Sequence, residues 1–65
     1  MIHVEAVIER KLEVALFRVR LANGHVVMAH SRFREQEKSA GLKAGDSVRL
    51  EMSPFDMSKG RIVFL

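Results

Sequence analysis

The sequence predicts a small all-β protein, a five-stranded barrel with one short helix between the third and fourth strands. Three observations lead to this prediction. The chain has 65 residues, room for one domain (1–65), and it has no cysteine, so no disulfide can stabilise it. Most of the chain alternates apolar and polar residues at the two-residue period of a half-buried strand. One segment, residues 31–40, lacks this alternation and is rich in helix formers.

The first strand is expected over residues 2–9. Val4, Ala6 and Ile8 alternate there with more polar neighbours, which predicts one buried face and one solvated face. Residues 10–13 are mostly charged and are expected to form the first loop.

The second and third strands are predicted to form a hairpin. Phe17, Val19 and Leu21 alternate with arginines and are expected to face the core. Asn23 and Gly24 both tolerate positive φ, which a two-residue type I′ turn requires. Such a turn gives these pairs: Leu21 with Val26, Val19 with Met28, and Phe17 with His30.

A short helix is expected next, over residues 31–40. Ser31 is a candidate N-cap, and Gly41 is a candidate for the residue that ends the helix. Phe33 is expected to plug the bottom of the barrel, and the alternative is an exposed anchor for a protein contact.

Two strands complete the predicted domain. A turn at Gly45-Asp46 precedes residues 47–52, and a loop at 53–60 precedes the last strand, 61–65. Phe55, in the loop, is expected to cover one end of the barrel, and the alternative is stacking on a base. The inward residues of the two strands are predicted to be Val48, Leu50, Met52, Ile62 and Phe64.

Three strands, a short helix and two more strands are the element order of the OB-fold. This partly open Greek-key barrel often binds oligonucleotides. A five-stranded sandwich without the helix is the competing interpretation.

Composition favours a binding protein over an enzyme. Eleven Lys and Arg against eight Asp and Glu give a net charge of +3, and these charges are spread along the chain. A basic surface must therefore be assembled by folding. His25 and His30 are the only histidines close in sequence, and they are expected on opposite strand faces, so neither a metal site nor an acid–base pair is predicted. No cofactor is expected. No segment resembles a signal peptide or a membrane span, so a cytoplasmic location is expected.

Several short motifs occur in a fixed order between Ile2 and Phe64, and matching them to a known family requires no insertion or deletion in this range. They are Phe17-Arg18-Val19, Asn23-Gly24-His25, Ala29-His30, Gly45-Asp46-Ser47-Val48 and Ser53-Pro54-Phe55-Asp56-Met57-Ser58-Lys59-Gly60-Arg61-Ile62. In order and spacing they resemble bacterial translation initiation factor one.

The resemblance implies a cytoplasmic OB-fold protein that binds the small ribosomal subunit at its A site. Its partners would be ribosomal RNA, a neighbouring ribosomal protein and the other initiation factors. A monomer is expected, and no membrane partner.

Two segments differ from the family pattern. The family usually follows Ala-His with Ile-Ser-Gly-Lys-Met-Arg-Lys, whereas Glu35 and Glu37 dilute the cations of this chain there. The first loop of the family often reads Leu-Pro-Asn, and this chain has Leu12-Glu13-Val14. These changes leave a second function open: a diverged paralogue or engineered chain that serves as a protein-interaction module and has lost strong ribosome binding.

The predicted nucleic-acid-binding residues are outward cations, a histidine beside the hairpin turn, and a glycine that lets the backbone approach a ligand. They are Arg18, Arg20, His25, Arg32, Arg34, Lys38, Lys59, Gly60 and Arg61.

Overall fold

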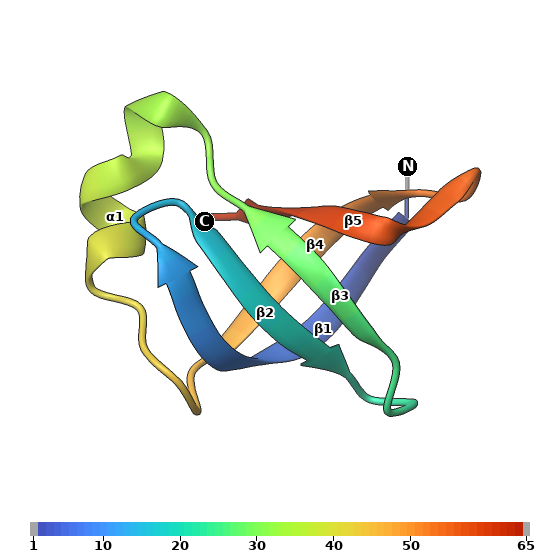
Figure 1. Ribbon diagram of the computed structural model, residues 1–65. Coiled ribbons are helices and arrows are strands. Elements are labelled where there is room, and N and C mark those ends of the chain that lie inside the picture. Colours follow the sequence, from blue (N-terminus) through green and yellow to red (C-terminus); the bar gives the residue numbers. More distant parts are fainter. Residues whose placement is uncertain (1, 65) are drawn as a thin grey trace.

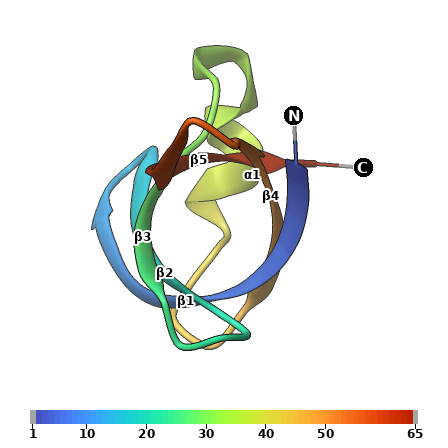
Figure 2. The same ribbon diagram turned by 90° about the vertical axis from the view of Figure 1, so that its right-hand side faces the viewer.

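A computed structural model describes residues 2–64, which form a closed five-stranded barrel with a short helix at one end (Figure 1; Figure 2). Around the barrel the strand order is β1-β2-β3-β5-β4, and β4 pairs again with β1. Among the strand pairs of residues 2–64, only β3 and β5 run parallel. This is the predicted OB-fold, and closure excludes the open sandwich. The elements are β1 (Ile2–Glu13), β2 (Leu16–Leu21), β3 (Val26–His30), a 3-10 turn (Phe33–Glu35), α1 (Gln36–Ala40), β4 (Ser47–Ser53) and β5 (Asp56–Val63).

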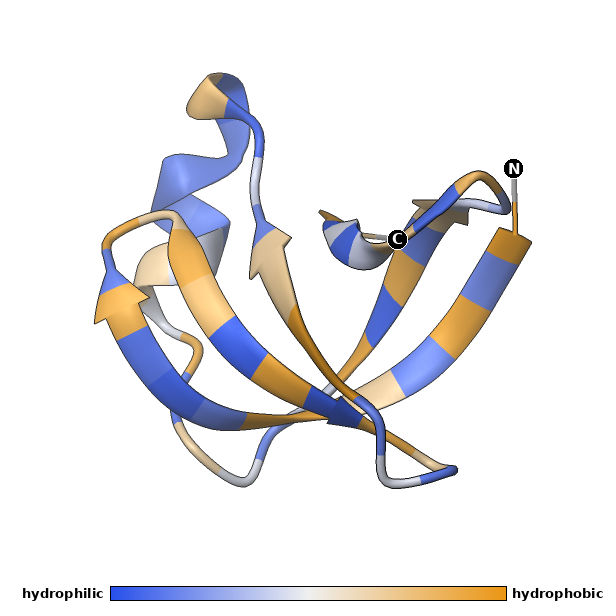
Figure 3. Cartoon of the chain, turned by 45° about the vertical axis from the view of Figure 1, so that its right-hand side comes forward, coloured by the Kyte–Doolittle hydropathy of each residue, from blue (hydrophilic) through white to orange (hydrophobic). Residues whose placement is uncertain are grey.

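The core is formed by alternate residues of the strands, visible as alternating bands of hydropathy in Figure 3. The inward positions predicted for β1, β2 and β4 are confirmed, with Val4 only partly buried near a barrel end. The buried apolar residues are Ala6, Ile8, Phe17, Val19, Leu21, Val27, Ala29, Val48, Leu50, Met52 and Ile62.

The register predicted for the β2–β3 hairpin is wrong by one residue. Val19 pairs with Val27 and Phe17 with Ala29, so Val27 and Ala29 point into the barrel. Met28 and His30, expected inside, are exposed. A shift of one residue moves every side chain of a strand to the opposite face.

The turn between β2 and β3 explains this shift. The backbone N–H of Leu21 donates to the carbonyl of His25 at 2.8 Å, and that of Gly24 donates to the carbonyl of Leu21 at 2.9 Å. Gly24 has a φ of +87°, whereas Asn23 does not have a positive φ, so the turn is not type I′. A turn followed by a left-handed glycine makes a three-residue loop, which changes the pairing by one position.

Two strands are longer than predicted. Residues 10–13 continue β1 rather than forming a loop, with shifts of register that begin between Ile8 and Arg10. Such a bulge bends a strand around a barrel without ending it. Residues 56–60 belong to β5, so the predicted loop shrinks to a tight turn after Ser53, whose Oγ accepts a hydrogen bond from the Phe55 N–H at 3.1 Å.

The helical segment closes the barrel differently from the prediction. It ends at Gly41 as expected, but Ser31 is not its N-cap, and Phe33 is 86% exposed rather than a plug. Ser39 is buried instead, with its hydroxyl 3.2 Å from the Val14 carbonyl and 3.0 Å from the Gln36 carbonyl. The short helix therefore meets the barrel through a small residue on its inner side and leaves the aromatic at its start in solvent.

Gly60 lies inside the barrel wall. A Cβ at this position would be 3.2 Å from Leu50 Cδ1 and 3.2 Å from Met52 Cγ, both in fully buried side chains. Gly60→Val is therefore expected to lower the free energy of unfolding by about 1–3 kcal/mol through overpacking. Urea unfolding measures this, with Gly41→Val as the control, because a Cβ at Gly41 meets only the Lys38 carbonyl at 3.8 Å. Equal midpoints for the two variants would contradict the packing assigned to Gly60.

Candidate nucleic-acid interface

The barrel brings distant cations together on the outer face of β2, β3 and β5. Arg18 of β2 is opposite Met28 of β3, and Met28 is opposite Lys59 of β5. In the next outward row His30 is opposite Arg61. We call this surface the cationic face and define it by six residues: Arg18, Arg20, Met28, His30, Lys59 and Arg61.

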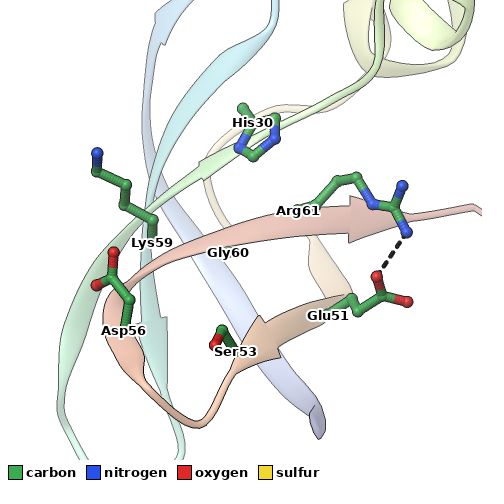
Figure 4. A pocket seen from close by; sticks show the side chains of 7 residues that line it. All are labelled: His30, Glu51, Ser53, Asp56, Lys59, Gly60 and Arg61. Carbon is green, nitrogen blue, oxygen red and sulfur yellow. Dashed lines mark hydrogen bonds and ion pairs between the residues drawn. The ribbon is translucent and has the colours of Figure 1, made fainter. Parts of the chain in front are cut away.

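A shallow, open depression of about 320 Å³ lies at the β5 side of the cationic face (Figure 4). Part of its wall is the backbone of β5 at Gly60, whose missing side chain would point the other way, into the core. The outward side chains of Lys59 and Arg61 flank this stretch of backbone, so an anionic chain can approach it between two cations. The lining residues are His30, Glu51, Ser53, Asp56, Lys59, Gly60 and Arg61.

Glu51 of β4 holds Arg61 in place. Its Oε1 accepts a hydrogen bond from Arg61 Nη2 at 2.7 Å (Figure 4), and its Oε2 is 3.2 Å from His3 Nε2. Both Arg61 and Glu51 are about three-quarters buried, so the pair restricts the guanidinium more than a fully solvated pair would. Arg61 is oriented at the edge of the depression, with part of its charge balanced.

Glu9 of β1 plays the corresponding part for the arginines of β2. One carboxylate oxygen is 3.4 Å from Arg18 Nε, and the other accepts a hydrogen bond from Arg20 Nε. About half of each arginine side chain remains exposed. Arg10 is the cross-strand partner of Arg18, so a third cation lies beside the pair.

Asp56 contributes a fixed negative charge near Lys59. The Ser58 hydroxyl, the Ser58 backbone N–H and the charge of Lys59 lower the pKa of Asp56, and slight desolvation opposes them. The hydroxyl donates at 2.6 Å and the N–H at 3.1 Å. Asp56 therefore stays ionised at neutral pH, and the depression has anionic as well as cationic walls.

No family model matches this chain, but a solved structure does. The chain superimposes with a TM-score of 0.72 on the solution structure of translation initiation factor one from the Wolbachia endosymbiont strain TRS of Brugia malayi. The two are 34% identical, and the match covers 95% of this chain and 74% of the other. The chain belongs to the translation initiation factor one family. The resemblance inferred from the sequence motifs is confirmed.

In this initiation-factor barrel the predicted site residues fall into two groups and one isolated residue. Arg18, Arg20, Lys59, Gly60 and Arg61 lie on or beside the cationic face. The second group follows the end of β3, towards α1, where Lys38 Nζ is 5.9 Å from the centre of the Phe64 ring. This group consists of Arg32, Arg34 and Lys38.

His25 is the isolated residue. It is exposed in the β2–β3 turn, at the opposite end of β3 from the helix (Figure 1). Its backbone N–H donates to Asn23 Oδ1 at 2.9 Å, which fixes the turn. The binding role predicted for it stays a prediction.

Sequence reasoning missed Met28, His30, Glu9 and Glu51 as members of the site. The wrong hairpin register assigned Met28 and His30 to the core. Glu9 and Glu51 contact arginines of neighbouring strands, and strand pairing is not readable from one segment.

Residues 2–64 contain no group of three His, Cys, Asp or Glu side chains arranged to hold a metal ion. In the same residues no helix is long and apolar enough to cross a membrane.

Proposed function

We propose that this member of the initiation factor one family binds RNA of the small ribosomal subunit, at the A site, through the cationic face. The observation that carries the proposal is the register of β2, β3 and β5. It aligns Arg18 with Lys59 across Met28, and His30 with Arg61, although the members come from both ends of the chain.

The chemistry of this face suits a sugar-phosphate backbone. Guanidinium and ammonium groups on neighbouring strands contact successive phosphates, and the RNA lies against the β5 backbone between Lys59 and Arg61. Met28, 37% exposed, offers an apolar contact to a ribose or base between Arg18 and Lys59. Arg32, Arg34 and Lys38 extend the contacts beyond the end of β3, and His25 extends them at the other end.

The cellular setting follows from this function. The partners proposed are ribosomal RNA, a neighbouring ribosomal protein and the other initiation factors, with the chain acting as a cytoplasmic monomer. It acts by occupancy of the site rather than by catalysis, and it needs no cofactor.

Arg61→Ala should weaken binding to purified small ribosomal subunits and flatten its salt dependence. Loss of one phosphate contact lowers the slope of log affinity against log salt by about 0.7–0.9. Co-sedimentation over a salt series measures this, with circular dichroism to verify the fold. Arg49→Ala is the matched control. It also removes an arginine that pairs with a carboxylate, Glu5 at 3.2 Å, but Arg49 lies outside the cationic face.

A charge-reversing variant tests the same assignment in the opposite direction. Glu35→Lys combined with Glu37→Lys restores the basic character that this segment has in the family, and should tighten binding and steepen the salt dependence. If this variant and Arg61→Ala both bind like the parent at every salt concentration, the RNA-facing assignment is wrong.

A protein-interaction module is the second candidate function. Phe33 is 86% exposed and Phe55 is 97% exposed, and exposed aromatic side chains are typical anchors of protein interfaces. For this function, RNA binding would be weak in the parent and unaffected by Arg61→Ala. The salt series therefore separates the two candidates.

A further inference from the structure

Glu9, at the bulge of β1, lies among the cations of β2. Ile8 pairs with Val19 and Arg10 with Arg18, so Glu9 lies between two paired positions without a partner of its own. Ile8 faces the core, so Glu9 projects from the outer face by regular alternation, as Arg18 and Arg20 do on β2. The bulge brings Arg10, the next residue, onto the same face.

Both oxygens of this carboxylate are engaged. One is 3.4 Å from Arg18 Nε, and the other accepts the hydrogen bond from Arg20 Nε. Arg18 and Arg20 are two residues apart on one strand, on the same face. Two guanidinium groups that bind one pair of oxygens form the arrangement with which arginines also bind a phosphate.

We propose that Glu9 occupies the place of a phosphate on the cationic face and acts as an internal competitor that limits RNA affinity. The inference rests on the proposed function and assigns a regulating contact within that site. A phosphodiester can engage Arg18 and Arg20 fully only after the carboxylate has moved away. Glu9 thus reduces the number of phosphates that the face holds at equilibrium.

The surrounding charges make the exchange feasible. Arg10 lies across from Arg18, so a third arginine lies near the two that pair with Glu9, and an excess of positive charge remains. The side chains of Arg18 and Arg20 are about half exposed, which leaves them accessible to a ligand. Ion pairs exposed to this degree are weak, so a polyanion can replace them.

Glu9→Gln tests the proposal because it removes the charge and keeps the shape. The probe is a labelled oligouridine, whose binding is followed by fluorescence anisotropy over a salt series. Glu9→Gln should bind roughly three- to tenfold more tightly at low salt, since two weak ion pairs no longer compete. The slope of log affinity against log salt should steepen by about 0.7 for each additional phosphate that the face neutralises.

Glu5→Gln is the matched control. It makes the same change in net charge on the same strand, but its carboxylate pairs with Arg49 at 3.2 Å, outside the cationic face. A second comparison places Glu9→Gln in a background of Arg18→Ala and Arg20→Ala. The substitution should have no effect there, because the two groups that it releases are absent.

The possible outcomes distinguish the competitor role of Glu9 from the proposed RNA-binding function. Tighter binding by Glu9→Gln alone, lost in the double-alanine background, supports the competitor role. If Glu9→Gln binds RNA no better than Glu5→Gln while Arg61→Ala still weakens binding, the inference is overturned and the RNA-binding function stands. If neither the parent nor any variant binds oligouridine or small subunits, both are overturned.

Discussion

Phe17→Ala is expected to leave most of the protein unfolded at room temperature. Phe17 is the largest of the fully buried side chains, at 0% exposure, and its removal opens a cavity in the core of the barrel. Substitutions of this type cost about 3–5 kcal/mol. A core this small supplies about 3–5 kcal/mol in total, and no disulfide adds to it. Circular dichroism and a thermal melt measure the loss.

Phe55→Ala is the control for this prediction. It deletes the same atoms from a side chain that is 97% exposed, so its melting temperature should stay close to that of the parent. A melt of Phe17→Ala that matches the melt of Phe55→Ala would show that Phe17 is not part of the core.

Val27→Asp is expected to prevent folding, whereas Met28→Asp should fold. Val27 is 2% exposed, and an uncompensated buried charge costs about 3–5 kcal/mol, comparable to the stability of the whole domain. Met28 is exposed between Arg18 and Lys59, where a new carboxylate has cationic neighbours. Urea unfolding of the two variants measures the difference.

The two aspartate variants also distinguish the two hairpin registers. A two-residue type I′ turn would place Met28 in the core and Val27 outside, so the stabilities would be reversed. Met28→Asp has a functional consequence as well: a negative charge in the middle of the cationic face should weaken RNA binding although the fold is intact. A stable Val27→Asp variant would be incompatible with the pairing of Val19 with Val27.

The fold and its family could be predicted from the sequence because their signals are local. In β1, β2 and β4 apolar residues alternate with mostly charged or polar ones, so the apolar set specifies which residues face the core. Gly41 ends the helix as predicted, because the preference of glycine for helix C-termini is a property of the residue itself. The ordered motifs identified the family.

The candidate site was only partly predictable. Arg18, Lys59 and Arg61 could be named as outward cations, but their meeting on one face depends on the parallel pairing of β3 with β5. The carboxylates that hold them, Glu9 and Glu51, come from strands on either side. No periodicity within one segment predicts such contacts.

The register of β3 was decided by the tertiary structure alone. Residues 26–29 read Val-Val-Met-Ala, so both faces of the strand are apolar and hydrophobic alternation cannot choose between them. The choice falls to the turn, where Gly24 adopts a positive φ and Asn23 does not. That difference in loop geometry brings Met28 and His30 onto the cationic face and sends Val27 and Ala29 into the core. The sequence alone thus determined the barrel, the family and most of its cations, while the outer surface of β3 depended on backbone geometry that residue types do not specify.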